Sequence, residues 1–403
     1  MTATIQDFPL ETIDLSDVQF GQSVPYDAFA ALRARAPIWW YEPEQCWVVT
    51  SYELVGEINR DFARFSSGIG PMKPGDPIYA EVPVMLADDP PVQTMYRRLV
   101  RGGWTPNAIL GRTSLVEDTV RDVVGAFVAN GGGDFVDDVA AQIAMRVVST
   151  MVGVPASDGP MLLAWSNAMM PGQTVGDPDY RPDPQAGPRA RAAILEYFEH
   201  VLAEHRKQPG DDLASNLLQL RKEDGSALDP RELRDFMLMF ITGGNDTTRH
   251  LLSQSILAFT ENPGERERLV AGEVTVASAV EEMLRWTTPV LQHSRRATQD
   301  VQIGGQLIQE GQRVTLWMIS ANNDETVFQA PRVMDLGRLP NPHTSFGSGG
   351  PHFCLGVHLA RLEAVVSFEA FRAFLPNLRL AGTPERVWTN FFNALKRLPV
   401  ALG

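Results

Sequence analysis

The spacing of apolar residues along the chain predicts a protein built mainly from helices. Apolar side chains recur every three or four positions in residues 26–36 ("YDAFAALRARA") and again over residues 229–261. Asn262-Pro263 is predicted to end that long helix, because proline cannot continue one. A further helix is expected to end near the sequence "EEMLRW", and the last to follow the second cysteine of the chain.

Two segments that lie far apart in the sequence carry strand patterns instead. Residues 38–50 ("IWWYEPEQCWVVT") predict a hairpin, and residues 295–320 contain short strands separated by turns. Because strands so far apart are expected to pair within one body, we predict a single domain over residues 1–403, although the length alone suggests two or three. The predicted fold class is α+β: mainly α, with a β-rich lobe from these two segments and a helical lobe from the rest.

Composition and charge exclude some kinds of binding partner and cellular location for this protein. The chain carries a net charge of −14, which argues against nucleic acid or acidic membranes as the main partner. The first twenty residues have neither the basic start nor the apolar core of a secretory signal. The longest apolar stretch, around "FMLMFITGG", is far short of the roughly 20 residues that a membrane span needs. We therefore predict a cytoplasmic protein with no membrane partner.

A pair of glycines interrupts the long predicted helix at "ITGGNDTTRH". Each glycine inside a helix costs roughly 1 kcal/mol relative to alanine, so something should offset the loss. The Thr247 hydroxyl can bond back to the carbonyl of Gly243 one turn earlier. The pair either opens a groove for a ligand, with Asp246 and Thr247 beside it, or permits close helix packing, and the sequence leaves both interpretations open.

Two charged or polar pairs lie at helical spacing. Glu282 and Arg285 are three residues apart, and Gln93 and Arg97 are four apart, so each pair shares one helix face. Taken alone, pairs of this kind are usually exposed and contribute little to stability.

Cys354 lies in the loop "FGSGGPHFCLG" and directly precedes an amphipathic helix. Free backbone N–H groups and the helix dipole at such a position favour a thiolate, which suits a nucleophile or a soft metal ligand. The sequence contains neither a base-and-orienter set for a cysteine hydrolase nor cysteine and histidine at zinc spacing. A single axial thiolate ligand to haem iron fits best, with a buried structural cysteine as the alternative. The other cysteine, Cys46, is predicted to be a packed thiol.

Taken together and in this order, these motifs resemble the soluble bacterial cytochrome P450 family of haem-thiolate monooxygenases. The resemblance runs from "YDAFAALRARAP" to the closing "FFNALKRLPV". It implies the cytochrome P450 fold, with haem b (iron protoporphyrin IX) between the long central helix and the Cys-loop helix. It also implies that O2 is a co-substrate.

The resemblance assigns roles to individual residues. Cys354 matches the thiolate ligand, and Thr247 and Asp246 match the alcohol and acid that deliver protons to bound dioxygen. The implied haem contacts are Gln93, Arg97, Arg295, His343, Phe346, Gly349, His352 and Gly356. Glu282 and Arg285 match a buried charge pair, with Arg338 as its third member.

The sequence departs from the family pattern in two places. Phe346 and Cys354 are eight residues apart where seven is commonest, and the surplus lies around Gly350-Pro351. Loops of the same length occur in some relatives, so we interpret the surplus as the mark of a subfamily. Gln93 stands where histidine is frequent, and it still provides a hydrogen-bond donor.

The resemblance also implies a substrate class and partners. We expect hydroxylation of a hydrophobic terpenoid, steroid or lipid-like molecule by a monomer that receives electrons from a separate ferredoxin and its NAD(P)H-dependent reductase. An acidic ferredoxin is expected to dock near Arg98 and Arg101. The alternatives are oxidation of a substituted aromatic compound, a haem-binding sensor without turnover, and a haem enzyme that needs no external reductant. The expected substrate contacts are Met85, Leu86, Met169, Met170, Met237, Phe240, Gly243, Val290, Leu291 and Phe391.

Overall fold

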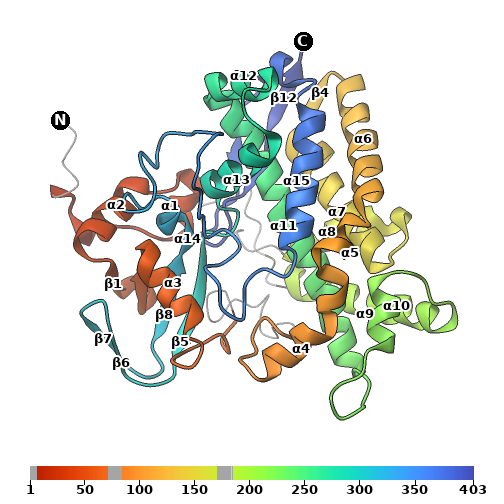
Figure 1. Cartoon of the computed structure of the whole chain (residues 1–403), viewed down its shortest axis with the longest axis horizontal. Coiled ribbons are helices and arrows are strands. Elements are labelled where there is room, and N and C mark those ends of the chain that lie inside the picture. Colours follow the sequence, from red (N-terminus) through yellow and green to blue (C-terminus); the bar gives the residue numbers. More distant parts are fainter. Residues whose placement is uncertain (1–6, 71–83, 170–182, 184) are drawn as a thin grey trace.

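The computed structural model describes residues 7–70, 84–169, 183 and 185–403, and it divides into a β-rich region and a larger helical region (Figure 1). The prediction of a mainly α protein with a smaller β-rich part is therefore confirmed. The helices are α1 Asp17–Gln22, α2 Tyr26–Arg35, α3 Tyr52–Arg60, α4 Val92–Val100, α5 Pro106–Leu110, α6 Thr113–Ala129, α7 Ala141–Val152, α8 Gly159–Met169, α9 Ala186–Lys207, α10 Leu213–Gln219, α11 Pro230–Glu261, α12 Pro263–Ala271, α13 Val276–Thr287, α14 Met318–Ala321 and α15 Val357–Phe371.

The main sheet joins strands from both ends of the chain. Its order is β1-β2-β8-β5-β3, formed by β1 (Ile38–Tyr41), β2 (Cys46–Val49), β8 (Arg313–Trp317), β5 (Gln292–Ala297) and β3 (Phe65–Ser66). The β1–β2 hairpin is the predicted one, and β2 runs parallel to β8. Segments about 265 residues apart in sequence thus pair directly, as the strand patterns led us to expect.

The remaining strands are short and most were not predicted. A three-stranded sheet has the order β4-β12-β9 (Gly132–Asp134, Pro399–Leu402 and Leu378–Leu380), and β10 (Glu385–Arg386) pairs with β11 (Leu395–Arg397). A third small pair, β6 (Val301–Ile303) with β7 (Gln306–Ile308), falls inside the predicted segment. Strands of two to four residues are too short to show an alternating pattern, which is why the sequence does not reveal those outside that segment.

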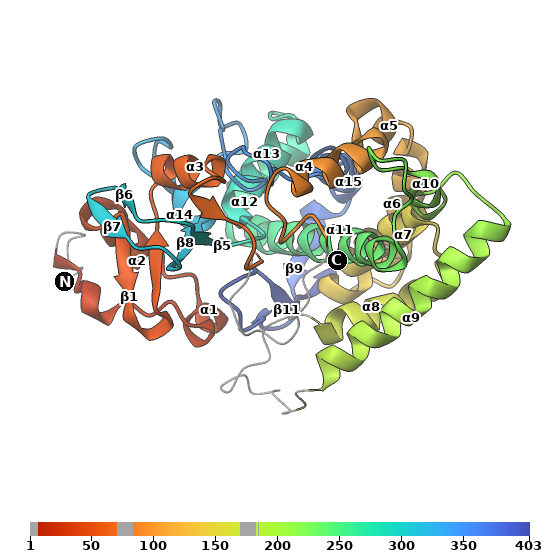
Figure 2. The same cartoon turned by 90° about the horizontal axis from the view of Figure 1, so that it is seen from below.

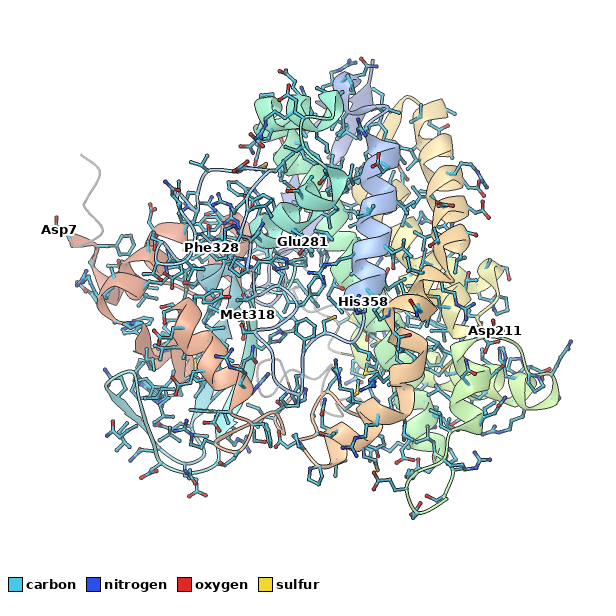
Figure 3. All side chains as sticks on the ribbon, in the orientation of Figure 1. Asp7, Asp211, Glu281, Met318, Phe328 and His358 are labelled. Atoms are coloured by element: carbon cyan, nitrogen blue, oxygen red, sulfur yellow. The ribbon has the colours of Figure 1, made fainter. Side chains whose placement is uncertain are left out.

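Helix α11 lies in the middle of the helical region, with α9 along one edge (Figure 2). Its start is fixed by a capping box in which the Asp229 carboxylate accepts from the Glu232 backbone N–H and the Glu232 carboxylate accepts from that of Asp229. Pro230 occupies the first turn and the helix ends at Glu261, at the predicted boundaries. Side chains extend into the space between the β-rich region, where Met318 lies, and α15, where His358 lies (Figure 3).

A buried carboxylate connects α13 to the chain segment that precedes the Cys354 loop. Glu282 and Arg285 are both 0 % exposed, and Arg285 donates two hydrogen bonds to Glu282 at 2.7 and 2.8 Å. Arg338 reaches the same carboxylate at 3.1 Å, so the three side chains that the resemblance grouped are in contact. The Asp335 backbone N–H and the Asn341 amide complete the shell at 3.1 Å each.

In the described part of the chain, every helix is too short or too polar to cross a membrane.

Candidate active site

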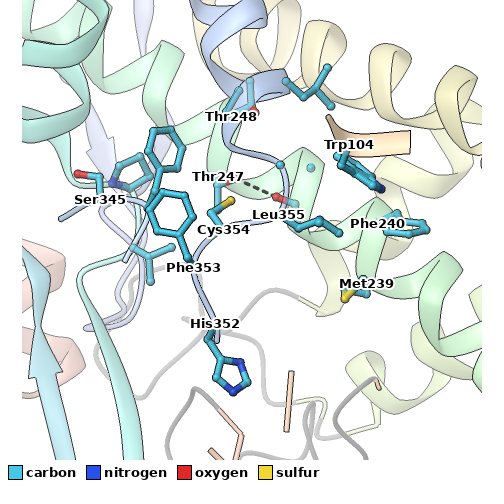
Figure 4. Close-up of a pocket in the computed structure, with 18 of the residues that line it drawn as sticks. Trp104, Met239, Phe240, Thr247, Thr248, Ser345, His352, Phe353, Cys354 and Leu355 are labelled. Atoms are coloured by element: carbon cyan, nitrogen blue, oxygen red, sulfur yellow. Dashed lines mark hydrogen bonds between the residues drawn. The ribbon is translucent and has the colours of Figure 1, made fainter. Parts of the chain in front are cut away.

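A cavity of about 290 Å³ lies where α11, α4, β5 and the Cys354 loop meet (Figure 4). Helix α11 contributes one continuous stripe of residues to its wall: Met239, Phe240, Gly243, Gly244, Thr247, Thr248 and Leu251. The Cys354 loop and α15 form another wall, with Ser345, Phe346, His352, Phe353, Cys354, Leu355, Gly356, Leu359, Ala360 and Glu363. The rest comes from Met85, Leu86, Gln93, Arg97, Trp104, Leu284, Pro289, Val290 and His293.

Cys354 is held on the cavity wall by its own loop. Its backbone N–H donates to the carbonyl of Phe346 at 2.9 Å, and it lies two residues before Gly356, the N-cap of α15. Burial raises the pKa of its thiol above the ordinary value, although the Gly356 N–H and the Arg97 guanidinium act in the opposite direction. The helix terminus, on which the expected thiolate rested, therefore does not by itself lower the pKa of this thiol, whereas a bound metal cation would favour the thiolate.

The glycines of this loop are required by its backbone. Gly347, Gly349 and Gly350 have φ of 89°, 92° and 80°, in the left-handed region that other residues avoid. A Cβ at Gly350 would also lie 2.4 Å from the carbonyl oxygen of Asn59. The loop therefore lies closer to the end of α3 than any side chain at position 350 would permit.

The surplus residue of the loop has a structural partner. The carbonyl of Pro351 accepts a hydrogen bond from the Gln93 amide at 2.7 Å and a longer one from Arg97 at 3.4 Å. Gln93 is 1 % exposed, so its amide depends on this carbonyl. Both side chains come from α4, which is thereby joined to the loop three residues before Cys354.

Each interpretation of the glycine pair in α11 holds for one glycine. The Thr247 hydroxyl donates to the carbonyl of Gly243 at 2.8 Å, as the spacing suggested. A Cβ at Gly243 would meet no atom within 4 Å, so this glycine leaves space in the cavity. At Gly244 a Cβ would lie 2.8 Å from the Val148 side chain, so this glycine lets α11 approach α7 closely.

Alanine substitutions should separate these two roles. Gly243→Ala is expected to raise the free energy of unfolding by up to about 1 kcal/mol, because alanine favours the helix, while it reduces the cavity and weakens ligand binding. Gly244→Ala is expected to lower the free energy of unfolding, since overpacking against Val148 costs about 1–3 kcal/mol. Denaturant unfolding and ligand titration of both variants would check this, and equal effects at the two positions would contradict it.

Asp246 does not line the cavity, although it precedes Thr247. Its carboxylate is 6 % exposed and accepts hydrogen bonds from the Asn245 amide at 2.8 Å and from the Ser166 hydroxyl of α8 at 3.4 Å. Burial raises the pKa of Asp246 to about 6, against the opposing effect of the nearby Arg249 guanidinium. Both protonation states are therefore accessible near neutral pH, which suits a group that transfers protons.

This raised pKa makes the stability of the protein depend on pH. The folded state binds the proton of Asp246 more tightly than the unfolded state, so stability from this group is lost as pH rises from about 4 to about 6. Asp246→Asn removes this loss, so relative to wild type it should be more stable at pH 7.5 than at pH 5 by about 1.4 kcal/mol, because the rest of the roughly 3 kcal/mol is already lost below pH 5. Denaturant unfolding at both values would check it, with the exposed Asp118→Asn as the control. A difference that does not change with pH would contradict it.

The residues expected to bind the haem carboxylates are only partly brought together. Arg97 and His352 line the cavity, as does Gln93, but Arg295 and His343 are not among its lining residues in the described part of the chain. Arg295 is buried on β5 and donates to Asn59 at 2.9 Å. His343 is hydrogen-bonded to Glu281 at 3.1 Å.

The cavity's donors fit a group that carries a metal and carboxylates. Nε2 of His352 is buried and meets no hydrogen-bond partner within the described residues. Within the described residues, the Arg97 guanidinium donates to the Pro351 carbonyl at the long distance of 3.4 Å and pairs with no carboxylate. Buried donors of this kind normally have acceptors. An iron porphyrin would supply both missing partners, a cation for the Cys354 sulfur and carboxylates for these donors.

The expected substrate residues divide into two groups. Met85, Leu86, Phe240, Gly243 and Val290 line the cavity. Met169, Met237, Leu291 and Phe391 are buried elsewhere and are not among its lining residues, and Met170 falls outside the described part of the chain.

The helical repeat explains the error at Met237. Met239 lies four residues before Gly243 and shares its face of α11, whereas Met237 lies on another face. The spacing to Gly243 could therefore have identified Met239 from the sequence.

Several cavity residues were not predicted from the sequence, among them the polar or aromatic side chains of Trp104, His293 and Glu363. Trp104 follows α4 and His293 lies on β5, and neither belongs to a recognisable motif. Glu363 on α15 is 1 % exposed, its Oε2 meets no partner within the described residues, and burial raises its pKa well above the ordinary value. No sequence pattern distinguishes these side chains from surface or core residues of the same type.

Arg98 and Arg101 are both exposed, and Arg98 makes a surface ion pair with Glu223 at 3.5 Å.

Comparisons with known proteins agree with this geometry. A family model described as "Cytochrome P450" matches residues 177–380. A steroid C26-monooxygenase of Rhodococcus jostii is 34 % identical over 99 % of this chain and 86 % of its own length. A methyl-branched lipid omega-hydroxylase of Mycobacterium bovis is 32 % identical over 97 % of this chain and 95 % of its own. The solved structure of a Mycobacterium marinum cytochrome P450 in complex with pseudoionone superposes with a TM-score of 0.90, at 32 % identity and full coverage of both chains.

Proposed function

The chain belongs to the cytochrome P450 family of monooxygenases, and we propose that it hydroxylates a hydrophobic steroid, terpenoid or lipid-like substrate. The observation that carries the proposal is the placement of Cys354, Gly243 and Thr247 around one cavity that is otherwise lined largely by apolar side chains, such as Met85, Leu86, Met239, Phe240 and Val290. The curated relatives named above act on a steroid and on a methyl-branched lipid, which supports the same substrate class here.

The residues of the chain would hold the cofactor in the following way. The Cys354 sulfur would be the ligand for the haem iron, and Arg97 and His352 would bind its carboxylates. The chemistry that haem supplies when bound is the reductive activation of O2 and the insertion of one oxygen atom into the substrate. The apolar side chains Met239, Phe240 and Val290 bind the substrate and exclude water.

Thr247 and Asp246 are proposed to manage protons on the α11 side of the cavity. Because the Thr247 hydroxyl donates its hydrogen to Gly243, its oxygen retains lone pairs that can accept a hydrogen bond from the cavity. Asp246 lies next to it in the helix and away from the cavity, with a pKa near neutrality. This arrangement supports a path in which Asp246 takes up and releases protons on the side of α11 away from the cavity, and Thr247 positions them within the cavity.

Electrons would come from a separate ferredoxin and its reductase. The exposed Arg98 and Arg101 lie on α4 and just after it, and the same helix contacts the Cys354 loop through Gln93 and Pro351. An acidic partner bound to these arginines would therefore lie on an element that touches the loop of the proposed iron ligand.

Substrate binding and turnover test the proposal directly. Purified holoprotein should give type I spectral shifts with steroids or terpenoids, and with ferredoxin, reductase and NADH it should convert a bound compound to a hydroxylated product. Substituted aromatic compounds serve as the comparison set. Shifts and products only with the aromatic set, or turnover without any electron donor, would contradict it.

Replacing the Thr247 hydroxyl should uncouple electron transfer from product formation. Thr247→Ala is expected to bind substrate as wild type does, but to divert most NADH-derived electrons to hydrogen peroxide, because the acceptor at this oxygen is lost. The measurement is the ratio of product to NADH consumed. Thr247→Ser keeps the hydroxyl and should retain most of the coupling. A Thr247→Ala enzyme with unchanged coupling would disprove the role.

A further inference from the structure

We propose that His293 forms a polar subsite in the substrate cavity that binds a hydroxyl or carbonyl oxygen of the substrate. This inference rests on the proposed function and adds a polar requirement to the hydrophobic class named there.

The position of His293 on the cavity wall is fixed by the main sheet. It lies on β5 and is paired with Leu316 of β8 in a regular antiparallel register. Because side chains alternate along a strand, His293 and Arg295 share one face, and Gln292 and Ser294 the other. His293 lines the cavity together with the neighbouring Pro289 and Val290.

An aromatic contact holds the imidazole ring in place. The rings of His293 and Phe391 meet edge to face, with centroids 6.3 Å apart and an angle of 75° between their planes. Phe391 is 8 % exposed and is not one of the lining residues, so it supports the histidine without occupying the substrate space. The ring is thus positioned before any ligand arrives.

His293 also lacks the partners that other polar residues of the cavity have. The Thr247 hydroxyl donates to Gly243, Ser345 donates to the Leu284 carbonyl at 2.6 Å, and the Gln93 amide donates to Pro351. Neither ring nitrogen of His293 takes part in a hydrogen bond within the described residues. A ligand that enters this space therefore meets an imidazole with both of its nitrogens available.

The imidazole is neutral at physiological pH. Burial lowers its pKa to about 3, and the nearby Arg295 guanidinium and His352 ring act in the same direction. A neutral imidazole offers one N–H donor and one nitrogen acceptor. It can donate to a carbonyl or accept from a hydroxyl, whereas an arginine can only donate.

The apolar side chains that line the same cavity make the His293 imidazole selective for substrates that carry an oxygen atom. Met85, Leu86 and Val290 give a purely hydrocarbon ligand good contacts but leave the imidazole without a partner once water is displaced. A buried polar group without a partner costs free energy that a matching oxygen atom avoids. Substrates that carry one oxygen near this wall are therefore preferred over hydrocarbons of the same shape.

The test compares ligands that differ by one oxygen atom. Pseudoionone and its deoxygenated hydrocarbon, and testosterone and its 17-deoxy analogue, are titrated into the holoproteins of wild type, His293→Leu and His293→Gln by difference spectroscopy. In wild type the oxygenated member of at least one pair should bind about 5- to 30-fold more tightly. His293→Leu should remove this preference, and His293→Gln, which keeps a donor and an acceptor, should restore much of it. Val290→Ala should weaken both members of a pair alike.

Three results would overturn the proposal, and they are distinguishable. If neither member of either pair binds to wild type while substituted aromatic compounds do, the proposed substrate class fails and the subsite fails with it. If both members bind and His293→Leu keeps the wild-type ratio, the substrate class stands and the subsite is wrong. If His293→Leu loses haem, measured by its absorbance per protein, His293 serves the cofactor instead.

Discussion

Cys354→Ala is expected to abolish oxygenation completely and to remove the strongly red-shifted Soret band of the thiolate-bound ferrous–CO complex. Among the residues that line the cavity, Cys354 supplies the thiol sulfur that could bind the iron as a thiolate. The loop around it fixes the position of the Cys354 backbone and supplies no second soft ligand. The measurements are the CO difference spectrum and product formation with ferredoxin and reductase. Retention of the red-shifted band would show that the assignment of the iron ligand is wrong.

The second cysteine provides the matched control. Cys46 is 1 % exposed on β2, in the β-rich region and outside the cavity. Cys46→Ala removes a thiol of the same kind, and we expect it to leave the CO spectrum unchanged, with at most a loss of stability. A loss of the red-shifted band in both variants would indicate general unfolding, which circular dichroism of the two proteins would reveal.

Glu282→Ala is expected to lower the free energy of unfolding by about 3–5 kcal/mol. The Glu282 carboxylate accepts hydrogen bonds from Arg285, Arg338 and the Asp335 N–H. Without this carboxylate, the Arg285 side chain, which is 0 % exposed, has no counter-charge. Denaturant unfolding, with haem release followed in parallel, is the measurement. Arg285→Ala should cost less, because Arg338 still pairs with the Glu282 carboxylate at 3.1 Å.

An exposed pair at the same spacing is the control for this prediction. Asp118 and Arg121 on α6 approach to 2.6 Å with side chains 62 % and 67 % exposed. Asp118→Ala should change the free energy of unfolding by no more than about 1 kcal/mol. If Glu282→Ala costs as little as Asp118→Ala, the buried pair is not important for stability.

The features that could be predicted from the sequence are those that depend on residues close together in the chain. The boundaries of α11 were predictable because Asp229, Pro230 and Asn262-Pro263 act on their own immediate neighbours. The bond from Thr247 to Gly243 was predictable for the same reason, since both residues belong to one turn of one helix. The family resemblance added what local chemistry could not, namely a reason to group Glu282, Arg285 and Arg338.

The remaining site residues depend on contacts between distant segments. His293 lines the cavity because β5 pairs with β8 in a particular register, and the sequence, which pointed to Val290 and Arg295 nearby, did not single it out. Glu363 belongs to an ordinary amphipathic helix, and only tertiary packing leaves its carboxyl buried. The separate roles of Gly243 and Gly244 required the position of Val148 on a different helix.

The hydrogen bond between Gln93 and the Pro351 carbonyl couples the length of the Cys354 loop to the side chain at position 93. A loop one residue shorter at this point would withdraw the acceptor from a side chain that is 1 % exposed, at a cost of about 1–3 kcal/mol. The two departures from the family pattern are therefore in direct contact, and each supplies the partner that the other needs.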